Sequence, residues 1–100
     1  MSASIYTISH AYMGKVENDG TVFGSMTDYL GIVDKDHRVY DASRNYLGYV
    51  DRDGSIYDSS HGYMGKIENE WLYDTSSQVV GRVDGSPRRM AAAAFFLLLR

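Results

Sequence analysis

A glycine recurs along this chain at a nearly constant spacing, and this repeat constrains the fold more than any other feature. The spacings are 17, 17, 17 and 16 residues, and the five glycines are Gly14, Gly31, Gly48, Gly65 and Gly81. A β-branched residue follows each glycine two positions later, and a tyrosine precedes the first four by two positions, with Val79 in the fifth place. A short fixed period of this kind indicates a repeat architecture.

Each repeat is predicted to form two short β-strands. One strand type follows the pattern of residues 38–41 and the other that of residues 46–51. Both are rich in aromatic and β-branched residues and are bounded by Gly, Asp, Asn and Ser, which is typical of strands. The expected fold class is therefore mainly β, with about ten short antiparallel strands in 17-residue hairpin repeats over residues 5–85.

The order of the two strand types predicts that the repeats close into a pseudo-symmetric ring. An open meander would leave two unpaired edges, which favour aggregation. The first and last strands are of complementary types, so we expect Ile5 and Tyr6 to pair beside residues 79–83.

One set of turns is predicted to end in a residue with left-handed backbone. Pairing Val50 with Ile56 leaves a three-residue loop that ends in Gly54, a position that is commonly left-handed. Gly20 and His37 hold the equivalent positions, and histidine is among the residues that tolerate positive φ. The other set of turns contains Asp and Ser, whose side chains accept hydrogen bonds from nearby backbone N–H groups.

The C-terminal segment, residues 86–100, is predicted to be an apolar α-helix. Ser86 is expected as its N-cap and Pro87 as its first residue, and the four alanines that follow favour helix. Residues 91–99 are apolar on every side, so we expect them to be buried and to supply core to the ring. Nine helical residues span about 14 Å, which is about half the hydrocarbon core of a bilayer.

Composition excludes several classes of protein. The chain has 100 residues, no cysteine and a formal net charge of −3. This length suits one domain over residues 1–100, and a cysteine-free chain has no disulfide, thiol nucleophile or Cys-ligated zinc. The acidic balance argues against a nucleic-acid partner, and no cofactor is expected. The N-terminus lacks the basic and apolar regions of a secretory signal, so we expect a cytoplasmic protein.

The segment from Gly48 to Ser60, Gly-Tyr-Val-Asp-Arg-Asp-Gly-Ser-Ile-Tyr-Asp-Ser-Ser, carries the repeat most fully. Iterated and followed by an alanine-leucine tail, it resembles the small bacterial β-flower proteins, over residues 5–99. The resemblance implies hairpins arranged like petals around a pseudo-symmetry axis, with the C-terminal helix packed against them. That family is described as four-fold, whereas this chain has five glycine columns, so both four and five petals remain open. The resemblance implies no activity and no catalytic residue.

The tyrosines that precede the repeat glycines are the main candidates for a binding surface. One interpretation is an aromatic platform for sugars, peptides or bases; the other is that these rings cover neighbouring strands and glycines. Departures from the repeat also mark places for a site, and they are Trp71, the shortened turn at Asn69-Glu70, His37 and Gly24. The candidate ligand-binding residues are Tyr12, Tyr29, Tyr46, Tyr63 and Trp71.

Other polar groups are interpreted as parts of turns. Asp51-Arg52-Asp53-Gly54 is similar to the start of a calcium loop, but the twelfth residue is Gly62 instead of glutamate. His10 and His61 hold equivalent positions in two nearly identical stretches, without the motif of a Ser-His-Asp hydrolase. Arg88 and Arg89 precede the apolar run and suit either a solvated connector or contact with anionic lipid. No metal or catalytic residue is assigned.

The sequence therefore predicts a non-enzymatic structural or protein-interaction module, with self-association or a protein partner left open. A small-ligand or carbohydrate-binding module, using exposed tyrosines and turn carboxylates, is the alternative. Membrane association through the C-terminal helix is a second and less favoured alternative, and it depends on whether Leu97–Leu99 are exposed.

Overall fold

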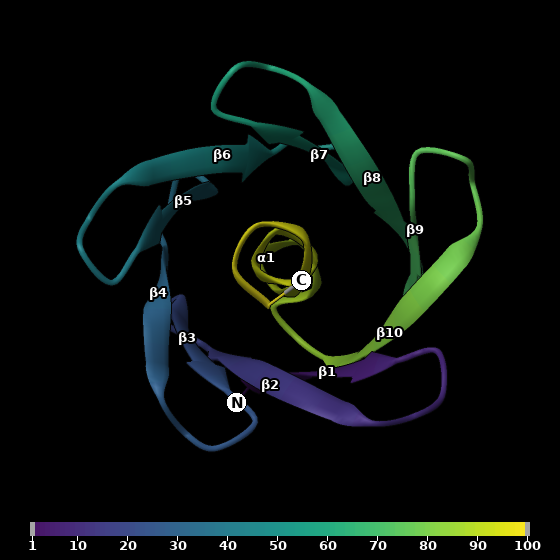
Figure 1. The fold of residues 1–100 in the computed structure, drawn as a ribbon, viewed down its shortest axis with the longest axis horizontal. Coiled ribbons are helices and arrows are strands. Elements are labelled where there is room, and N and C mark those ends of the chain that lie inside the picture. The colour runs from purple at the N-terminus through teal and green to yellow at the C-terminus, as the bar shows by residue number, and fades with distance from the viewer. Residues whose placement is uncertain (1, 100) are drawn as a thin grey trace.

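Ten β-strands form a closed barrel around a C-terminal helix in the computed structural model, which describes residues 2–99 (Figure 1). The predicted domain ends, Met1 and Arg100, lie outside these described residues. The strands are β1 (Ser2–Thr7), β2 (Tyr12–Glu17), β3 (Thr21–Gly24), β4 (Tyr29–Val33), β5 (Arg38–Asp41), β6 (Tyr46–Val50), β7 (Ser55–Asp58), β8 (Tyr63–Glu68), β9 (Trp71–Tyr73) and β10 (Val79–Gly85). The helix consists of α1 (Arg88–Ala94) and a π-helical turn, η1 (Phe95–Leu99).

Every strand pairs antiparallel with its neighbours in the chain, and β1 pairs with β10 to close the ring. Ile5 lies opposite Val83, and Tyr6 lies opposite Arg82, which confirms the predicted closure. The hairpins β1–β2, β3–β4, β5–β6, β7–β8 and β9–β10 each contain a shift in register. These five hairpins are the petals of the ring in Figure 1, so the petal number left open by the sequence is five.

The register shift places one extra apolar residue of each petal beside the core. In β5–β6, Gly48 lies opposite Val39 and Tyr46 opposite Tyr40, so Leu47 is the extra residue. Such a bulge breaks the in-out alternation of a strand. The side chains that it turns toward the core are Met13, Leu30, Leu47, Met64 and Val80.

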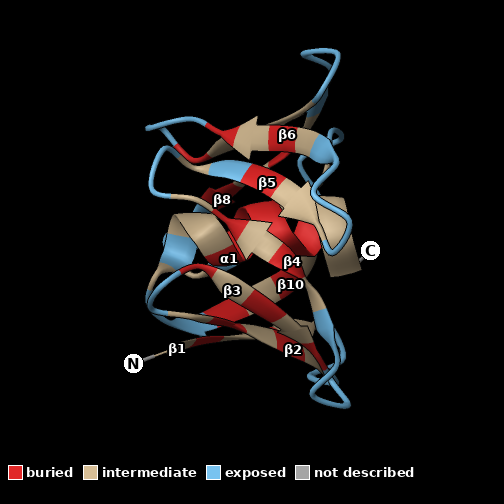
Figure 2. Ribbon diagram, turned by 90° about the vertical axis from the view of Figure 1, so that its left-hand side faces the viewer, coloured by how far each residue is buried: buried red, intermediate tan, exposed pale blue. Residues whose placement is uncertain are grey.

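The core consists of the inner faces of the strands and the helix that they enclose. Ala91–Ala94 are fully buried, and Phe95 and Phe96 are almost fully buried. Figure 2 shows buried residues that alternate with partly exposed ones along the strands, and further buried residues in α1. The predicted burial of the tail is therefore confirmed for these residues, and Leu97–Leu99 pack against the core while remaining partly exposed.

The form of the helix differs from the prediction in two respects. Pro87 is the N-cap and Ser86 lies outside the helix, with a cis peptide bond between them and no side-chain cap. Residues 95–99 form a π-helix, whose i→i+5 hydrogen bonds place more residues in each turn than the about 3.6 of an α-helix. Five consecutive residues can thus face five petals, one each. The contacts are Phe95 with Gly81, Phe96 with Gly65, Leu97 with Gly48, Leu98 with Gly31 and Leu99 with Gly14.

The turns follow the predicted chemistry. Gly54, Gly20 and His37 have φ of 91°, 94° and 65°, so all three adopt the left-handed conformation expected of them. In the opposite set of turns, the Asp41 Oδ1 accepts hydrogen bonds from the backbone N–H groups of Ser43 and Asn45, both at 2.9 Å. The equivalent carboxylates of Asp58 and Asp74 accept the same pair of bonds.

Candidate functional site

The predicted tyrosine column lies on the outer wall of the barrel, where each ring packs against an aromatic residue of the preceding strand. The ring centroids are 5.8 Å apart for Tyr6–Tyr12, 6.4 Å for Phe23–Tyr29, 5.8 Å for Tyr40–Tyr46 and 5.9 Å for Tyr57–Tyr63. The second ring of each pair remains between 39% and 50% exposed. These tyrosines therefore cover the strands of their own petals and also face solvent. We call this surface the aromatic wall.

Each of these four tyrosines belongs to a different petal, so the structure does not bring them together into one pocket. Instead, in four petals the residue that follows the repeat glycine covers an aromatic ring of the adjacent strand. Three of these covering groups are cations, namely Lys15 over Phe23, Lys66 over Tyr73 and Arg82 over Tyr6, at 5.8, 5.5 and 4.9 Å from the ring centroids.

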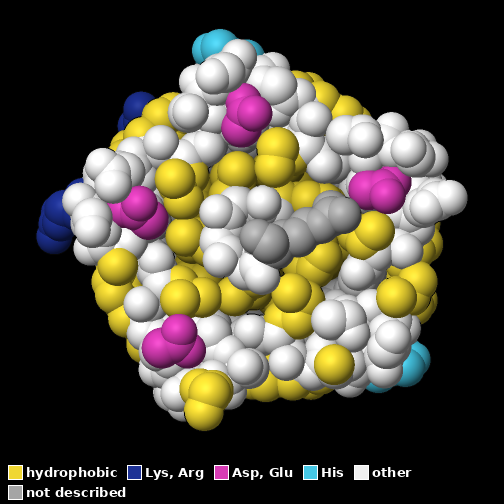
Figure 3. Space-filling model, viewed as in Figure 1, with side chains coloured by type: hydrophobic (Ala, Val, Ile, Leu, Met, Phe, Trp, Pro, Cys, Tyr) yellow, Lys and Arg dark blue, Asp and Glu magenta, His cyan; other side chains and the backbone are white. Residues whose placement is uncertain are grey.

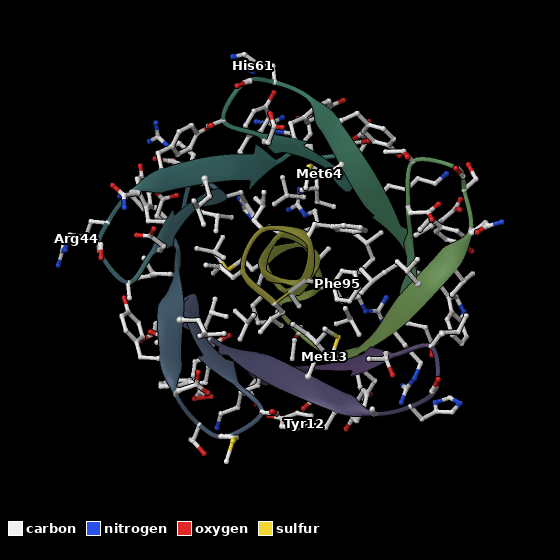
Figure 4. All side chains as sticks on the ribbon, in the orientation of Figure 1. Tyr12, Met13, Arg44, His61, Met64 and Phe95 are labelled. Atoms are coloured by element: carbon white, nitrogen blue, oxygen red, sulfur yellow. The ribbon has the colours of Figure 1, made fainter. Side chains whose placement is uncertain are left out.

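In the β6–β7 pair the covering residue is Tyr49. Its ring stacks on Tyr57 with centroids 5.2 Å apart and an angle of 24° between the ring planes. The Tyr49 hydroxyl lies 3.3 Å from Nδ1 of His61, whose ring meets that of Tyr49 edge to face. Desolvation in this stack raises the pKa of Tyr49 above its usual range, and the nearby Tyr57 hydroxyl adds to the effect. His61 lies at the outer end of its petal in Figure 4.

The fifth petal, β9–β10, departs from this pattern and contains a groove. Val79 lies opposite Tyr73 where the other petals have a tyrosine. The groove has a volume of about 410 Å³ and is lined by Ile8, His10, Trp71, Tyr73 and Val79. Ile8 is 58% exposed and Trp71 is 38% exposed. We call this site the Trp71 groove.

Of the five predicted binding residues, only Trp71 lines this groove. Sequence reasoning missed Ile8, His10, Tyr73 and Val79 as site residues. One signal in the sequence could have indicated this groove. Val79 interrupts the tyrosine column, so the outer wall has one aromatic ring fewer at this petal.

A second groove lies on the β4–β5 part of the wall. It has a volume of about 330 Å³ and is lined by Tyr29, Ile32, Asp34, Tyr40 and Arg44. Aromatic faces, a carboxylate and a guanidinium group are together the functional groups that bind a sugar ring by stacking and hydrogen bonding. The Asp34 Oδ1 already accepts hydrogen bonds from two backbone N–H groups, those of Asp36 and Arg38.

The turn carboxylates act mainly on their own loops. Hydrogen bonds from the backbone and side chain of Asn45 lower the pKa of Asp41, and those from Thr21 lower the pKa of Asp19. Asp51 and its neighbours do not form a set of metal ligands. Within residues 2–99, no three acidic or histidine side chains are grouped so as to hold a metal ion. The calcium-like start at Asp51 therefore has the geometry of a turn, in which the Asp51 Oδ1 accepts a bond from the backbone N–H of Arg52.

Of the remaining departures from the repeat, Gly24 has a local structural explanation, and His37 has a defined place but no structural explanation. Gly24 takes the place of the turn aspartate, and a Cβ there would lie 2.5 Å from the Oδ1 of Asp28, whose carboxylate fills that space. His37 lies where the ring meets the start of the helix, beside Arg89. The Arg89 guanidinium donates a hydrogen bond to the Arg52 carbonyl at 3.3 Å, so this arginine is tied to a petal.

The end of the barrel that faces the viewer in Figure 1 is apolar around its axis. Figure 3 shows hydrophobic side chains gathered there, with acidic side chains farther out. Met13 and Met64 point toward the axis in Figure 4, and Leu97–Leu99, like them, pack against the buried core. Neither helical segment within residues 2–99 combines the length and the hydropathy of a membrane-crossing helix.

Comparison with known proteins agrees with this architecture. Curated proteins and solved structures gave no match to the chain. The family model described as "5-fold beta-flower protein" matches residues 1–99, in accord with the five petals. The chain therefore belongs to the 5-fold beta-flower protein family.

Proposed function

We propose that this protein is a non-enzymatic interaction module that binds a protein partner, or a second copy of itself, through the aromatic wall. The observation that carries the proposal is the half-exposed tyrosine in four successive petals, with Trp71 exposed on the fifth. Tyrosine and tryptophan are enriched at protein interfaces because they combine a large apolar area with a polar tip. These rings are held by their neighbours, so they lose little conformational freedom on binding.

Rigid placement of the rings supports this proposal further. Each exposed tyrosine is packed against a second aromatic ring, and each petal is fixed by a ladder on both sides of the closed barrel. Pre-organised contact groups bind with a smaller entropic cost than flexible ones. The wall also repeats around the ring, so one partner surface can contact more than one petal.

Carbohydrate binding is the second candidate, and the β4–β5 groove favours it. Tyr29 and Tyr40 offer ring faces there, while Asp34 and Arg44 offer an acceptor and a donor. A sugar ring needs both kinds of group, because its faces are apolar and its edge carries hydroxyls. Membrane association has less support, because the apolar tail that would insert is largely enclosed by the barrel.

Site-specific photo-crosslinking tests the protein-interaction proposal. A benzoylphenylalanine at Tyr46, on the wall, is compared with one at Lys35, an exposed turn residue off the wall. The expected result is a discrete crosslinked product from position 46 and none from position 35, either in the purified protein or in a lysate of the source cells. Equal crosslinking from both positions, or crosslinking from position 35 alone, contradicts the proposal.

A further inference from the structure

The Trp71 groove lacks one aromatic ring that the other four petals possess. In those petals the paired rings have centroids 5.8–6.4 Å apart. In β9–β10 the equivalent pair is Tyr73 and Val79, which lie opposite each other in the register. Valine is much smaller than tyrosine, so the space beside Tyr73 is open, and the groove of about 410 Å³ lies there.

The surroundings of this open space suit a flat apolar ring. Trp71 and Tyr73 come from the same strand and lie on the outer face, on either side of the buried Leu72. Ile8, in the turn between β1 and β2, is 58% exposed and forms part of the lining. Aromatic rings pair favourably with one another beyond the contribution of the buried area. An added ring would thus repeat at this petal the contact that the protein makes within the other four.

Charges beside the groove are already paired, which favours a neutral ligand. Lys66 Nζ lies 5.5 Å from the Tyr73 ring centroid and 3.8 Å from the Glu68 carboxylate. Arg82, opposite Trp71 in the register, lies 3.9 Å from the Glu70 carboxylate. A charged ligand would have to compete with these ion pairs, whereas an uncharged ring would not.

His10 supplies the polar side chain of the groove. It holds the same turn position as His61, and the two have φ of 70° and 68°. The Nδ1 of His61 lies 3.3 Å from the hydroxyl of Tyr49, which comes from the preceding petal. The petal that precedes His10 around the closed ring carries Arg82 at the position of Tyr49. Within residues 2–99, the His10 side chain has no hydrogen-bond partner. The equivalent histidine of another petal, His61, thus contacts a phenol hydroxyl, and His10 is free to contact one from outside.

We infer that the Trp71 groove binds a tyrosine side chain presented by a partner protein, with the ring beside Tyr73 and Trp71 and the hydroxyl at His10. This inference deepens the proposed function and rests on it. A sugar fits the groove less well, because its several hydroxyls would face a lining with a single imidazole and otherwise aromatic and aliphatic side chains.

Titration with capped amino acids tests this inference directly. Trp71 is the only tryptophan of the chain, so its fluorescence and its indole N–H resonance report on the groove alone. N-acetyl-tyrosinamide is expected to give a saturable change in both signals. N-acetyl-phenylalaninamide, which lacks the hydroxyl, should bind about fivefold more weakly, and N-acetyl-leucinamide more than about tenfold more weakly.

Three variants separate the contributions. Val79→Tyr fills the open space with the residue that the other petals carry, so it should fold and should weaken tyrosinamide binding by about tenfold or more. Met26→Tyr adds the same ring at a position that is 86% exposed in a different petal, and it should leave binding unchanged. His10→Ala should make the tyrosine and phenylalanine probes bind equally.

Equal binding of the three probes, or undiminished binding to the Val79→Tyr variant, overturns the inference. Its failure can be distinguished from failure of the proposed function. If the probes do not bind while position 46 crosslinks to a partner, only the inference about the groove is wrong. If the probes bind but no position on the aromatic wall crosslinks to a protein, the proposal that the chain binds a protein partner is contradicted.

Discussion

Gly65 lies directly against the ring of Phe96, so closely that a Cβ on this glycine would come within 2.5 Å of the Phe96 Cζ. Its φ of 152° lies in the region that favours glycine. The other four repeat glycines each face one further residue of the helical tail, at 3.0–3.3 Å from an added Cβ. The glycine repeat is thus explained by two close approaches to each glycine, one by a carbonyl oxygen of the neighbouring strand and one by a residue of the tail.

Replacement of Gly65 by alanine should destabilise the protein by about 2–4 kcal/mol, because the new methyl group meets both the Phe96 ring and the Tyr73 carbonyl in a tightly packed interior. Chemical denaturation measures the loss. Gly62→Ala is the matched control, because Asn45 carries a side chain at the same place, where its backbone N–H donates to the equivalent carboxylate of Asp41. The control should change the free energy of unfolding by less than about 0.5 kcal/mol. Equal losses in both variants would show that the contact with the tail is unimportant.

A larger side chain in the alanine segment of α1 should disrupt the barrel. Ala92 is fully buried, and α1 packs against β1, β2, β4, β6, β8 and β10, so no side of the helix has free space. Ala92→Leu should lower the free energy of unfolding by about 1–3 kcal/mol or more, as measured by thermal or chemical denaturation. Ala42→Leu adds the same side chain at an exposed turn and should have little effect. A tolerated Ala92→Leu would mean that the helix does not fill the ring.

The depressed pKa of Asp41 predicts a stability contribution that depends on pH. The N–H groups of Asn45 are the main cause, so the folded-state pKa lies below the ordinary value of 3.8. A carboxylate of this kind stabilises the fold above its unfolded-state pKa, and the contribution is lost as the pH falls through the folded-state pKa. NMR titration should show the pKa of Asp41 rising partway toward normal in Asn45→Ala, which removes the side-chain bond and keeps the backbone one. An unchanged pKa in that variant would contradict the assignment.

Completion of the aromatic wall should stabilise the fifth petal. Val79→Tyr restores the aromatic pair with Tyr73 that the other petals possess, and such a pair contributes about 0.5–1.5 kcal/mol beyond area burial. The melting temperature of this variant should therefore rise while its affinity for N-acetyl-tyrosinamide falls. The Met26→Tyr variant should show neither change. A destabilised Val79→Tyr variant would indicate that the space beside Tyr73 does not accept a ring.

The architecture could be predicted from the sequence because the repeat expresses local rules. Strand type and turn conformation follow from residue patterns that each lie within one hairpin, and the closing pair follows from the complementary types of the first and last strands; the structure confirms them at Gly54, Asp41 and Ile5. The petal number was open only because the resemblance suggested four. Ten paired strands and five bulged hairpins establish five.

The π-helical turn and the groove could not be predicted in the same way. In the π-helical turn, each of Phe95–Leu99 lies against the repeat glycine of one petal, and no local signal in five apolar residues distinguishes this turn from an α-helix. The groove depends on a turn from one petal lying beside the strands of another, which brings Ile8 and His10 to Trp71. Such juxtapositions arise only once the ring is closed.

Closure of the ring around the tail is the central claim, and a designed disulfide tests it most directly. Ser4 lies opposite Asp84 across the β1–β10 pair, and the chain has no cysteine of its own. Oxidation of the Ser4→Cys, Asp84→Cys double variant should give an intramolecular crosslink in the monomer, and the Ser4→Cys, Ser43→Cys control should give none. Failure of the first pair to crosslink within one chain, or equal crosslinking of both pairs, would contradict the closed five-petal ring.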